Sequence, residues 1–139
     1  MLRGGLENWL GPLRAGEEQI EPAELALRPR EDDLISAEEI EERLGKPGFV
    51  VLDARVPERY RGEVEPIDPV AGHIPGAVNM PYTAEPSAVD PDSEVAVYCG
   101  SGITAAVTVL VLERAGVAAR LYPGSWSEWS TRGLAVECG

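Results

Sequence analysis

One stretch of the sequence decides the fold: Val95-Ala96-Val97-Tyr98-Cys99-Gly100-Ser101-Gly102-Ile103-Thr104-Ala105. An apolar run of strand length leads to a cysteine, a glycine-rich loop follows, and a helix begins. The first N–H groups of a helix have no partners within it, and together with the helix dipole they favour an ionised sulfur. The pattern therefore predicts a reactive thiolate at Cys99. The competing interpretation is a small apolar cysteine buried at the end of a core strand.

Strands and helices alternate around this stretch. A continuous apolar run predicts a buried parallel strand at 49–52, and mainly apolar runs predict further strands at 77–80, 94–98 and 119–122. A capping box opens a short helix from Ser36 to about Leu44, and an apolar segment ending at Gly116 predicts a buried helix over 103–115. This order predicts a three-layer α/β domain with a mostly parallel sheet flanked by helices.

Two polar sites follow strands of the predicted sheet, one at Cys99 and one at Asp53-Ala54-Arg55. Ligands of such sheets bind beyond the carboxyl ends of the strands, which is where both sites fall. Residues 56–72 are rich in proline and charge and predict a long loop that lines or covers a site. Arg59 and Arg61 in this loop are either anion ligands or solvated arginines.

The charge of the chain limits its partners. It carries 24 acidic residues against 12 lysines and arginines, a formal net charge of −12. Nucleic acid and anionic membranes need a basic footprint and are poor partners, whereas a small anion can still bind a local arginine and backbone amides. No apolar run approaches the roughly 20 residues that span a bilayer, and no export signal opens the chain. These features predict a cytoplasmic protein.

Several reaction classes that use a cysteine can be excluded for Cys99. A cysteine protease needs a histidine base, and the only histidine, His73, lies in a loop where a structural role is more common. A redox pair would need Cys-x-x-Cys, and Cys138 near the end of the chain is either incidental or a flexible resolving thiol. Metal ligands are too few. Tyrosine phosphatases use a similar loop, but they place an arginine where this chain has Ala105.

What remains is chemistry on sulfur. A thiolate of low pKa can attack a sulfane sulfur, carry it as a persulfide and pass it to an acceptor. The N–H groups of the loop then stabilise the negative charge of the persulfide. This chemistry needs no cofactor, no metal and no general base.

Four motifs in order support this interpretation. They are Asp53-Ala54-Arg55, Gly72-His73-Ile74-Pro75-Gly76-Ala77-Val78-Asn79, Tyr98-Cys99-Gly100-Ser101-Gly102-Ile103-Thr104-Ala105 and Gly124-Ser125-Trp126-Ser127-Glu128-Trp129. Together they resemble the C-terminal catalytic domain of the rhodanese sulfurtransferases. The resemblance extends from about Leu34 to the last residue and implies a rhodanese-like catalytic domain over 34–139.

The resemblance implies a role for each candidate site residue. Cys99 matches the cysteine that carries the persulfide. Arg55 matches an arginine that helps to bind anionic substrate, whereas Asp53 and His73 match positions that hold the fold together. Arg61, in the loop after Arg55, is a second candidate for substrate binding by its charge alone. The loop that binds substrate and persulfide is matched by Gly100, Ser101, Gly102, Ile103 and Thr104. The Cys-Gly-Ser-Gly sequence is similar to that of 3-mercaptopyruvate sulfurtransferases, so Ser101 is expected to contact substrate.

Residues 1–33 are expected to form a tail or linker. Their hexapeptide Gly4-Gly5-Leu6-Glu7-Asn8-Trp9 is similar to residues 124–129, and the resemblance implies the end of a preceding rhodanese domain. Two-domain members of the family build the pocket between their domains. We therefore expect a second copy of this chain, or a partner chain, to complete the pocket.

The leading hypothesis is a sulfurtransferase that moves sulfur from a small anionic donor, thiosulfate or 3-mercaptopyruvate, through a persulfide on Cys99. The acceptor is cyanide, a thiol or a carrier protein. The alternative is a non-catalytic rhodanese-like binding or regulatory module left from a truncated two-domain enzyme. An arsenate reductase or phosphatase that uses the same loop is a third hypothesis, which Ala105 disfavours.

Overall fold

Four parallel strands form the centre of the fold in the computed structural model, which describes residues 5–17, 19, 22, 24, 26, 30–85 and 89–139. The sheet order is β2-β1-β3-β4, and all three pairings are parallel. The strands are β1 (Phe49–Asp53), β2 (Val78–Asn79), β3 (Glu94–Tyr98) and β4 (Ala119–Leu121). Each apolar run that predicted a strand contains one, and the predicted parallel sheet is confirmed.

The pairing of β1 with β3 is the longest in the sheet. Val51 lies opposite Ala96 and Leu52 opposite Val97. Because successive side chains of a strand point to opposite faces, Val51 and Ala96 enter one apolar cluster and Leu52 and Val97 the other. Burial on both faces explains why these strands are continuous apolar runs rather than alternating ones.

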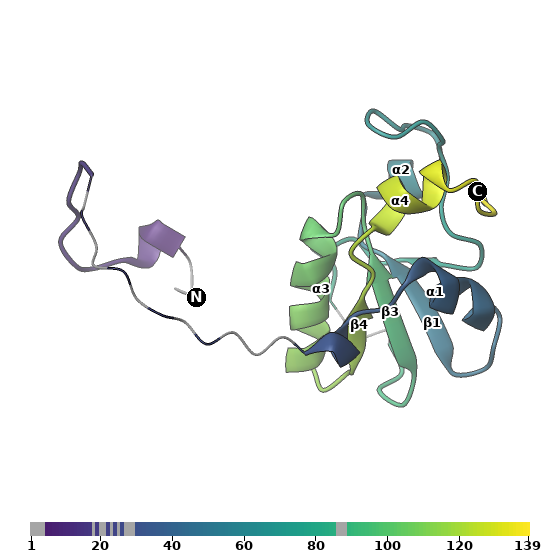
Figure 1. Ribbon diagram of the computed structural model, residues 1–139, viewed down its shortest axis with the longest axis horizontal. Helices are drawn as coiled ribbons and strands as arrows, with labels where there is room; N and C mark the ends of the chain where they lie inside the picture. The colour runs from purple at the N-terminus through teal and green to yellow at the C-terminus, as the bar shows by residue number, and fades with distance from the viewer. Residues whose placement is uncertain are drawn as a thin grey trace.

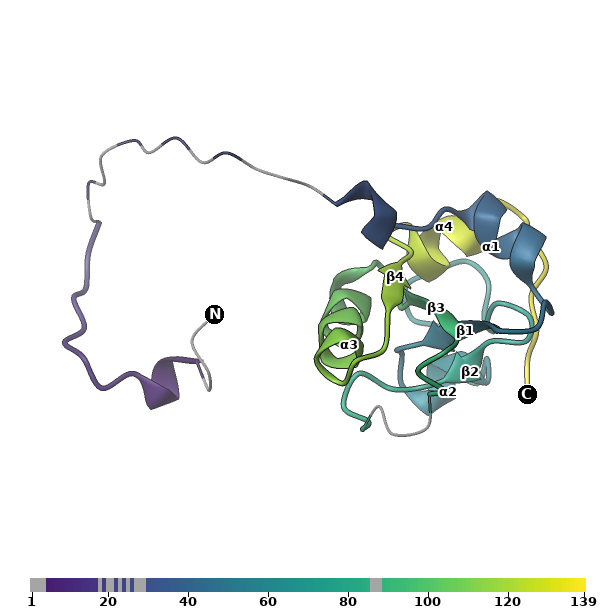
Figure 2. The same cartoon turned by 90° about the horizontal axis from the view of Figure 1, so that it is seen from below.

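Helices cover both faces of the sheet and give three layers (Figures 1 and 2). α1 (Ala37–Arg43) and α4 (Ser125–Thr131) pack against the face that carries Val51, and α3 (Ile103–Arg114) packs against the opposite face. The Ser36 hydroxyl accepts the Glu39 N–H at 3.2 Å, so Ser36 is the N-cap of α1, which is one half of the predicted capping box. Within the described ranges, no helix is both long and apolar enough to cross a membrane.

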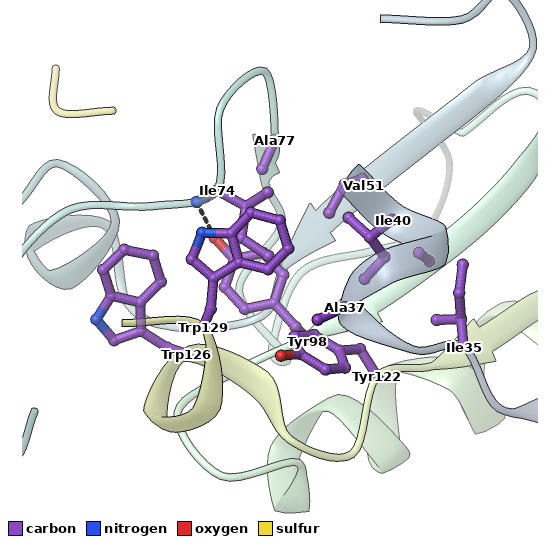
Figure 3. Packing of buried hydrophobic residues seen from close by; sticks show 11 residues of the cluster. Ile35, Ala37, Ile40, Val51, Ile74, Ala77, Tyr98, Tyr122, Trp126 and Trp129 are labelled. Carbon is purple, nitrogen blue, oxygen red and sulfur yellow. Dashed lines mark hydrogen bonds between the residues drawn. The ribbon is translucent and has the colours of Figure 1, made fainter. Parts of the chain in front are cut away.

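Aromatic side chains fill the core beneath α1 and α4 (Figure 3). Four of them are at most 1% exposed: Tyr98, Tyr122, Trp126 and Trp129. The Tyr98 hydroxyl accepts the Ile74 N–H at 3.1 Å, the bond drawn as a dashed line in Figure 3. This bond joins β3 to the loop before β2, so the core fixes the end of the sheet at which the candidate site lies.

Two segments add to the predicted organisation. The long loop after β1 contains a short helix, α2 (Pro57–Tyr60), which begins with a proline whose missing N–H costs nothing at that position. At the other end of the chain, η1 (Gly5–Asn8) lies apart from the sheet in both views, whereas η2 (Glu31–Asp33) leads into Leu34, which bridges to Leu121. Gly4, which begins the repeated hexapeptide, lies outside the described residues.

Candidate active site

The loop after β3 places Cys99 at the start of α3. We call residues 99–105 the sulfur loop. Gly102 has a φ of +81°, and a Cβ on it would lie 2.7 Å from the carbonyl oxygen of Pro123. Only glycine meets both conditions, because other residues avoid this left-handed conformation and would collide with backbone. The turn at Gly102 aims the first N–H groups of α3 at the sulfur.

The sulfur of Cys99 accepts hydrogen bonds from this loop. The donors are the Thr104 side chain and the backbone N–H groups of Ser101, Thr104 and Ala105. Cys99 is 2% exposed, and burial raises the pKa of its thiol, but the hydrogen bonds outweigh burial and leave the pKa below its ordinary value. This lowering of the pKa favours the thiolate form of Cys99, and its reactivity stays a prediction.

The N-terminus of α4 supports the sulfur loop from behind. Trp126 N–H donates to the Cys99 carbonyl and Ser127 N–H to the Gly100 carbonyl, both at 3.0 Å. The buried Ser125 hydroxyl accepts the Cys99 N–H at 3.1 Å and donates to the Tyr122 carbonyl at 2.9 Å. These bonds occupy the outward polar groups of the loop backbone, so its remaining N–H groups stay directed at the sulfur.

A cavity of about 320 Å³ opens over Cys99. Its wall combines the sulfur loop with the loop after β1 and the start of α4. The lining residues are Arg59, Ile67, Asp68, Cys99, Gly100, Ser101, Ile103, Thr104 and Ser127. Of the predicted loop residues, all but Gly102 line this cavity. A volume of this size accommodates a small donor such as thiosulfate or mercaptopyruvate.

Arg59 supplies a cation to the cavity wall. Its Nε and Nη2 donate to the two oxygens of Glu65 at 3.2 and 2.6 Å, and Nη2 also lies 3.4 Å from Asp68 Oδ2. The remaining nitrogen, Nη1, lies against Gly100, where a Cβ would come within 3.1 Å of it. Gly100 therefore leaves room for the guanidinium beside the sulfur loop.

Glu65 is the acceptor around which the loop after β1 is arranged. Its side chain is 3% exposed and accepts the N–H groups of Ile67 and Asp68 in addition to two arginines. Burial raises the pKa of Glu65, but Arg59 and these N–H groups outweigh it and hold the pKa below its usual range. Glu65 thus remains a carboxylate that orients Arg59.

Arg55, expected to bind substrate, lies inside the protein. Its guanidinium donates to Asp53 at 2.6 Å, to the Gly72 carbonyl at 2.7 Å and to Glu65 at 3.3 Å. It also lies 4.7 Å from the centre of the Trp126 ring, and its side chain is only 2% exposed. Arg55 does not line the cavity over Cys99. Its contacts instead join β1 to the loop before β2.

Arg61 and His73 also lie outside that cavity. Arg61 is 39% exposed and pairs with Glu63 at 2.7 Å. His73 is buried, stacks on the Tyr60 ring with centroids 3.8 Å apart, and has Nδ1 2.7 Å from the Tyr60 carbonyl oxygen. Its backbone pairs with Glu137, so His73 joins the loop before β2 to the C-terminal segment.

Sequence reasoning therefore gave Arg59 too little weight. Arg55, Arg59 and Arg61 share the same type of side chain, and only the fold separates one buried in ion pairs, one on the cavity wall and one in solvent. No pattern in the sequence singles out Arg59, because the short helix α2 that carries it and the cavity that it lines are seen only in the structure. The other cysteine, Cys138, is exposed and lies near the Ala71 carbonyl.

This fold and this cysteine loop match a known family. A rhodanese-like domain matches residues 36–132, and the chain belongs to the rhodanese family. It is 41% identical to a probable 3-mercaptopyruvate sulfurtransferase of Pseudomonas aeruginosa, over 94% of this chain and 54% of that protein. It is 35% identical to the human 3-mercaptopyruvate sulfurtransferase, over 95% of this chain and 52% of the human one.

A solved structure shows the same arrangement. The crystal structure of a probable thiosulfate sulfurtransferase is 37% identical and superposes with a TM-score of 0.71, covering 88% of this chain and 55% of that one. The chain thus spans about half the length of these relatives. Both donor types occur among their names, so the family relationship by itself leaves the donor open.

Proposed function

We propose that this protein is a sulfurtransferase that carries sulfur as a persulfide on Cys99. The observation that carries the proposal is the set of hydrogen bonds from the sulfur loop to Cys99, which lowers the pKa of the thiol beneath an open cavity. The sulfurtransferase names of relatives at 35 to 41% identity support the same activity. Such a site needs only a nucleophile and fixed N–H donors, and both are in place.

The first half-reaction forms the persulfide. The Cys99 thiolate attacks the outer sulfur of thiosulfate, a new S–S bond forms, and the old one breaks with its electron pair leaving on sulfite. With 3-mercaptopyruvate, the C–S bond breaks instead, and the thiol proton of the donor ends on the carbon of the pyruvate released. In both cases the negative charge moves outward by one sulfur atom, toward the N–H groups at the start of α3.

The second half-reaction restores the thiolate. A nucleophilic acceptor, which is cyanide, a thiol or a carrier protein, attacks the outer sulfur of the persulfide. The S–S bond breaks and its electron pair returns to Cys99. The low pKa of Cys99 favours this step as well, because a stable thiolate is a good leaving group.

Arg59 is the residue we assign to the anionic end of the donor. Its guanidinium lines the cavity, and Nη1 lies beside Gly100 while Nε and Nη2 contact carboxylates. Arg55 and Arg61 were expected to bind substrate, but the distances given above place them elsewhere. The proposal therefore transfers the anion-binding role to Arg59, with Ser101 also on the cavity wall.

Exposed apolar side chains at the mouth of the cavity favour a partner that covers it. Ile67 and Ile103 flank it with 73% and 75% of their surfaces exposed. Large apolar side chains at such a rim are typical of surfaces that another polypeptide covers. We propose that a second copy or another polypeptide closes the cavity, and light scattering after gel filtration at several protein concentrations tests for the second copy.

Mass spectrometry tests the proposed activity. The wild type, Cys99→Ser and Cys138→Ser are incubated separately with thiosulfate and with 3-mercaptopyruvate, and each peptide is examined for one added sulfur atom. We expect the added sulfur on Cys99 in the wild type and in Cys138→Ser, and thiocyanate release on addition of cyanide. Sulfur on Cys138 alone, or equal thiocyanate release by Cys99→Ser, contradicts the proposal.

A pH titration separates the enzyme from an inert module. The rate of Cys99 alkylation by iodoacetamide follows the thiolate fraction, so its midpoint reports the pKa of the thiol. An enzyme of this kind shows a midpoint below that of a free thiol, about 8.5. An ordinary midpoint together with no sulfur uptake from either donor favours the non-catalytic binding module.

A further inference from the structure

The charged groups beside the sulfur loop do not balance. We call Asp53, Arg55, Arg59, Glu65 and Asp68 the ion-pair cluster, because each contacts another member of the set within 3.4 Å. Its three carboxylates and two guanidiniums leave one negative charge in excess. All five side chains are at least four-fifths buried, so solvent screens this charge weakly.

The excess charge is assigned to Asp68 by geometry. Arg55 pairs closely with Asp53, and Arg59 pairs with Glu65 through two nitrogens. Among the described residues, the Asp68 carboxylate makes a single long contact, 3.4 Å, to a guanidinium nitrogen that Glu65 already holds at 2.6 Å. Asp68 is therefore not needed to orient Arg59.

The position of Asp68 gives its charge an effect on the reaction. Its side chain is 6% exposed, yet it lines the same cavity as Cys99 and Arg59. An anion that approaches Arg59 must therefore also approach Asp68. The repulsion is proportional to the charge of the anion, so a dianion is opposed twice as strongly as a monoanion.

We propose that Asp68 is a specificity-determining residue that disfavours dianionic sulfur donors relative to monoanionic ones. This inference rests on the proposed function. Thiosulfate is a dianion at neutral pH, whereas 3-mercaptopyruvate with its thiol protonated carries one negative charge. The cavity thus selects the carboxylate donor over thiosulfate through a repulsive group, while Arg59 supplies the attraction that both donors share.

Donor kinetics in Asp68→Asn test the proposal. The amide keeps the shape of the side chain and removes its charge. If removing the charge raises kcat/KM for the monoanion by about threefold, the same interaction raises it for the dianion by about ninefold, because the energy doubles with the charge. The change lies in KM rather than kcat and shrinks as salt is added. Asp68→Ser repeats the measurement with a smaller neutral side chain.

Glu63→Gln is the matched control. Glu63 lies in the same loop, is 53% exposed and pairs with Arg61 outside the cavity. It removes the same unit of net charge without changing the cavity wall, so we expect little change for either donor. Equal gains for both donors in Asp68→Asn, a loss for thiosulfate, or the same donor shift in Glu63→Gln overturns the proposal.

Alkylation of Cys99 gives a readout that does not depend on sulfur transfer. Iodoacetate is a monoanion and iodoacetamide is neutral, so the ratio of their rates at Cys99 reports the charge that an anion meets. Peptide mass spectrometry separates Cys99 from the exposed Cys138. Asp68→Asn is expected to raise this ratio by about threefold.

Donor kinetics and the alkylation ratio together distinguish failure of the proposed function from failure of the role proposed for Asp68. If the wild type takes sulfur from neither donor, the proposed function fails, and the alkylation ratio still decides whether Asp68 opposes anions at Cys99. If sulfur is transferred but neither the donor ratio nor the alkylation ratio changes in Asp68→Asn, the proposed function stands and Asp68 has no role in specificity.

Discussion

The loops that follow β1 and β3 leave the same edge of the sheet but handle charge in opposite ways. The ion-pair cluster after β1 pairs most of its charges with one another, through side chains up to 10 residues apart in sequence, and leaves one negative charge at Asp68. Apart from the Cys99 thiol, the sulfur loop after β3 contains no titratable side chain, and it presents backbone N–H groups whose positions the start of α3 fixes. The first loop holds the edge together, and the second leaves its donors free for a sulfur anion.

Arg55→Gln should have the largest effect, because it breaks the ion-pair cluster at its most buried point. Asp53 is 0% and Arg55 2% exposed in their side chains, so the substitution leaves a buried carboxylate without its counter-ion. We expect the free energy of unfolding in urea to fall by about 3 to 5 kcal/mol. Arg61→Gln, in the same loop but in solvent, is the control and should change it by less than about 0.5 kcal/mol. Equal unfolding midpoints for the two variants contradict this division of roles.

Gly102→Ala tests the sulfur loop, again through the free energy of unfolding. The new Cβ at position 102 would lie 2.7 Å from the Pro123 carbonyl oxygen. A new Cβ at Gly116, which has a φ of +86°, would lie in open space. Both variants put a side chain on a left-handed backbone, which lowers the free energy of unfolding by about 1 kcal/mol. Gly102→Ala adds a collision with backbone, so its total loss is about 2 kcal/mol or more. Gly102→Ala should also slow the alkylation of Cys99 at pH 7. If Gly116→Ala costs as much stability and slows alkylation equally, the close approach to Pro123 has no special role.

Arg59→Gln sharpens the comparison, since Arg59 belongs to the ion-pair cluster but faces the cavity of the sulfur loop. Glu65 keeps its bond to Arg55, so we expect a loss of only about 1 kcal/mol in the free energy of unfolding. Sulfur transfer from anionic donors should fall by about tenfold in kcat/KM, the effect of one charged hydrogen bond. Arg61→Gln serves again as the control, and activity equal to wild type in Arg59→Gln would remove Arg59 from the donor site.

Thr104→Val should have the smallest effect on stability and a specific effect on the thiol. It removes the side-chain hydrogen bond to the Cys99 sulfur, so the pKa of Cys99 rises and alkylation at pH 7 slows by about threefold. Thr108→Val is the matched control, because its hydroxyl is buried on the same helix and donates to the Thr104 carbonyl at 3.4 Å rather than to the Cys99 sulfur. An unchanged pH midpoint in Thr104→Val would show that the backbone N–H groups alone set the pKa.

The lowered pKa of Cys99 also predicts the sign of a stability change. A thiol whose folded pKa lies below its unfolded value stabilises the fold fully above the unfolded pKa, and this contribution is lost as the pH falls through the folded pKa. Relative to Cys99→Ser, the wild type should therefore gain stability as the pH rises between these two values. Urea unfolding of both proteins across this range measures the difference.

The sheet and the sulfur loop could be predicted from the sequence because both depend on local patterns. Continuous apolar runs mark strands buried on two faces, and a cysteine between such a strand and two glycines marks a helix N-terminus. Gly102 illustrates the second case, since its positive φ follows from the turn that the sequence requires.

The roles of the arginines could not be predicted in the same way. Arg55 and Arg59 are four residues apart, and which one reaches the cavity depends on Glu65 and Gly72, residues that meet them only in the folded chain. The charge excess at Asp68 is likewise a property of the set rather than of any one position. The position of a long side chain with several possible partners is determined by tertiary contacts, and these cannot be read from a single sequence.

The support of the sulfur loop by α4 has a consequence for the order of events during folding. The amides that hold the Cys99 and Gly100 carbonyls belong to Trp126 and Ser127, 27 residues further along the chain. Every strand pairing is parallel and needs a crossover, so no local hairpin can assemble this edge early. The loop that lowers the pKa of Cys99 therefore reaches its final form only when α4 packs against it, after most of the domain has been synthesised.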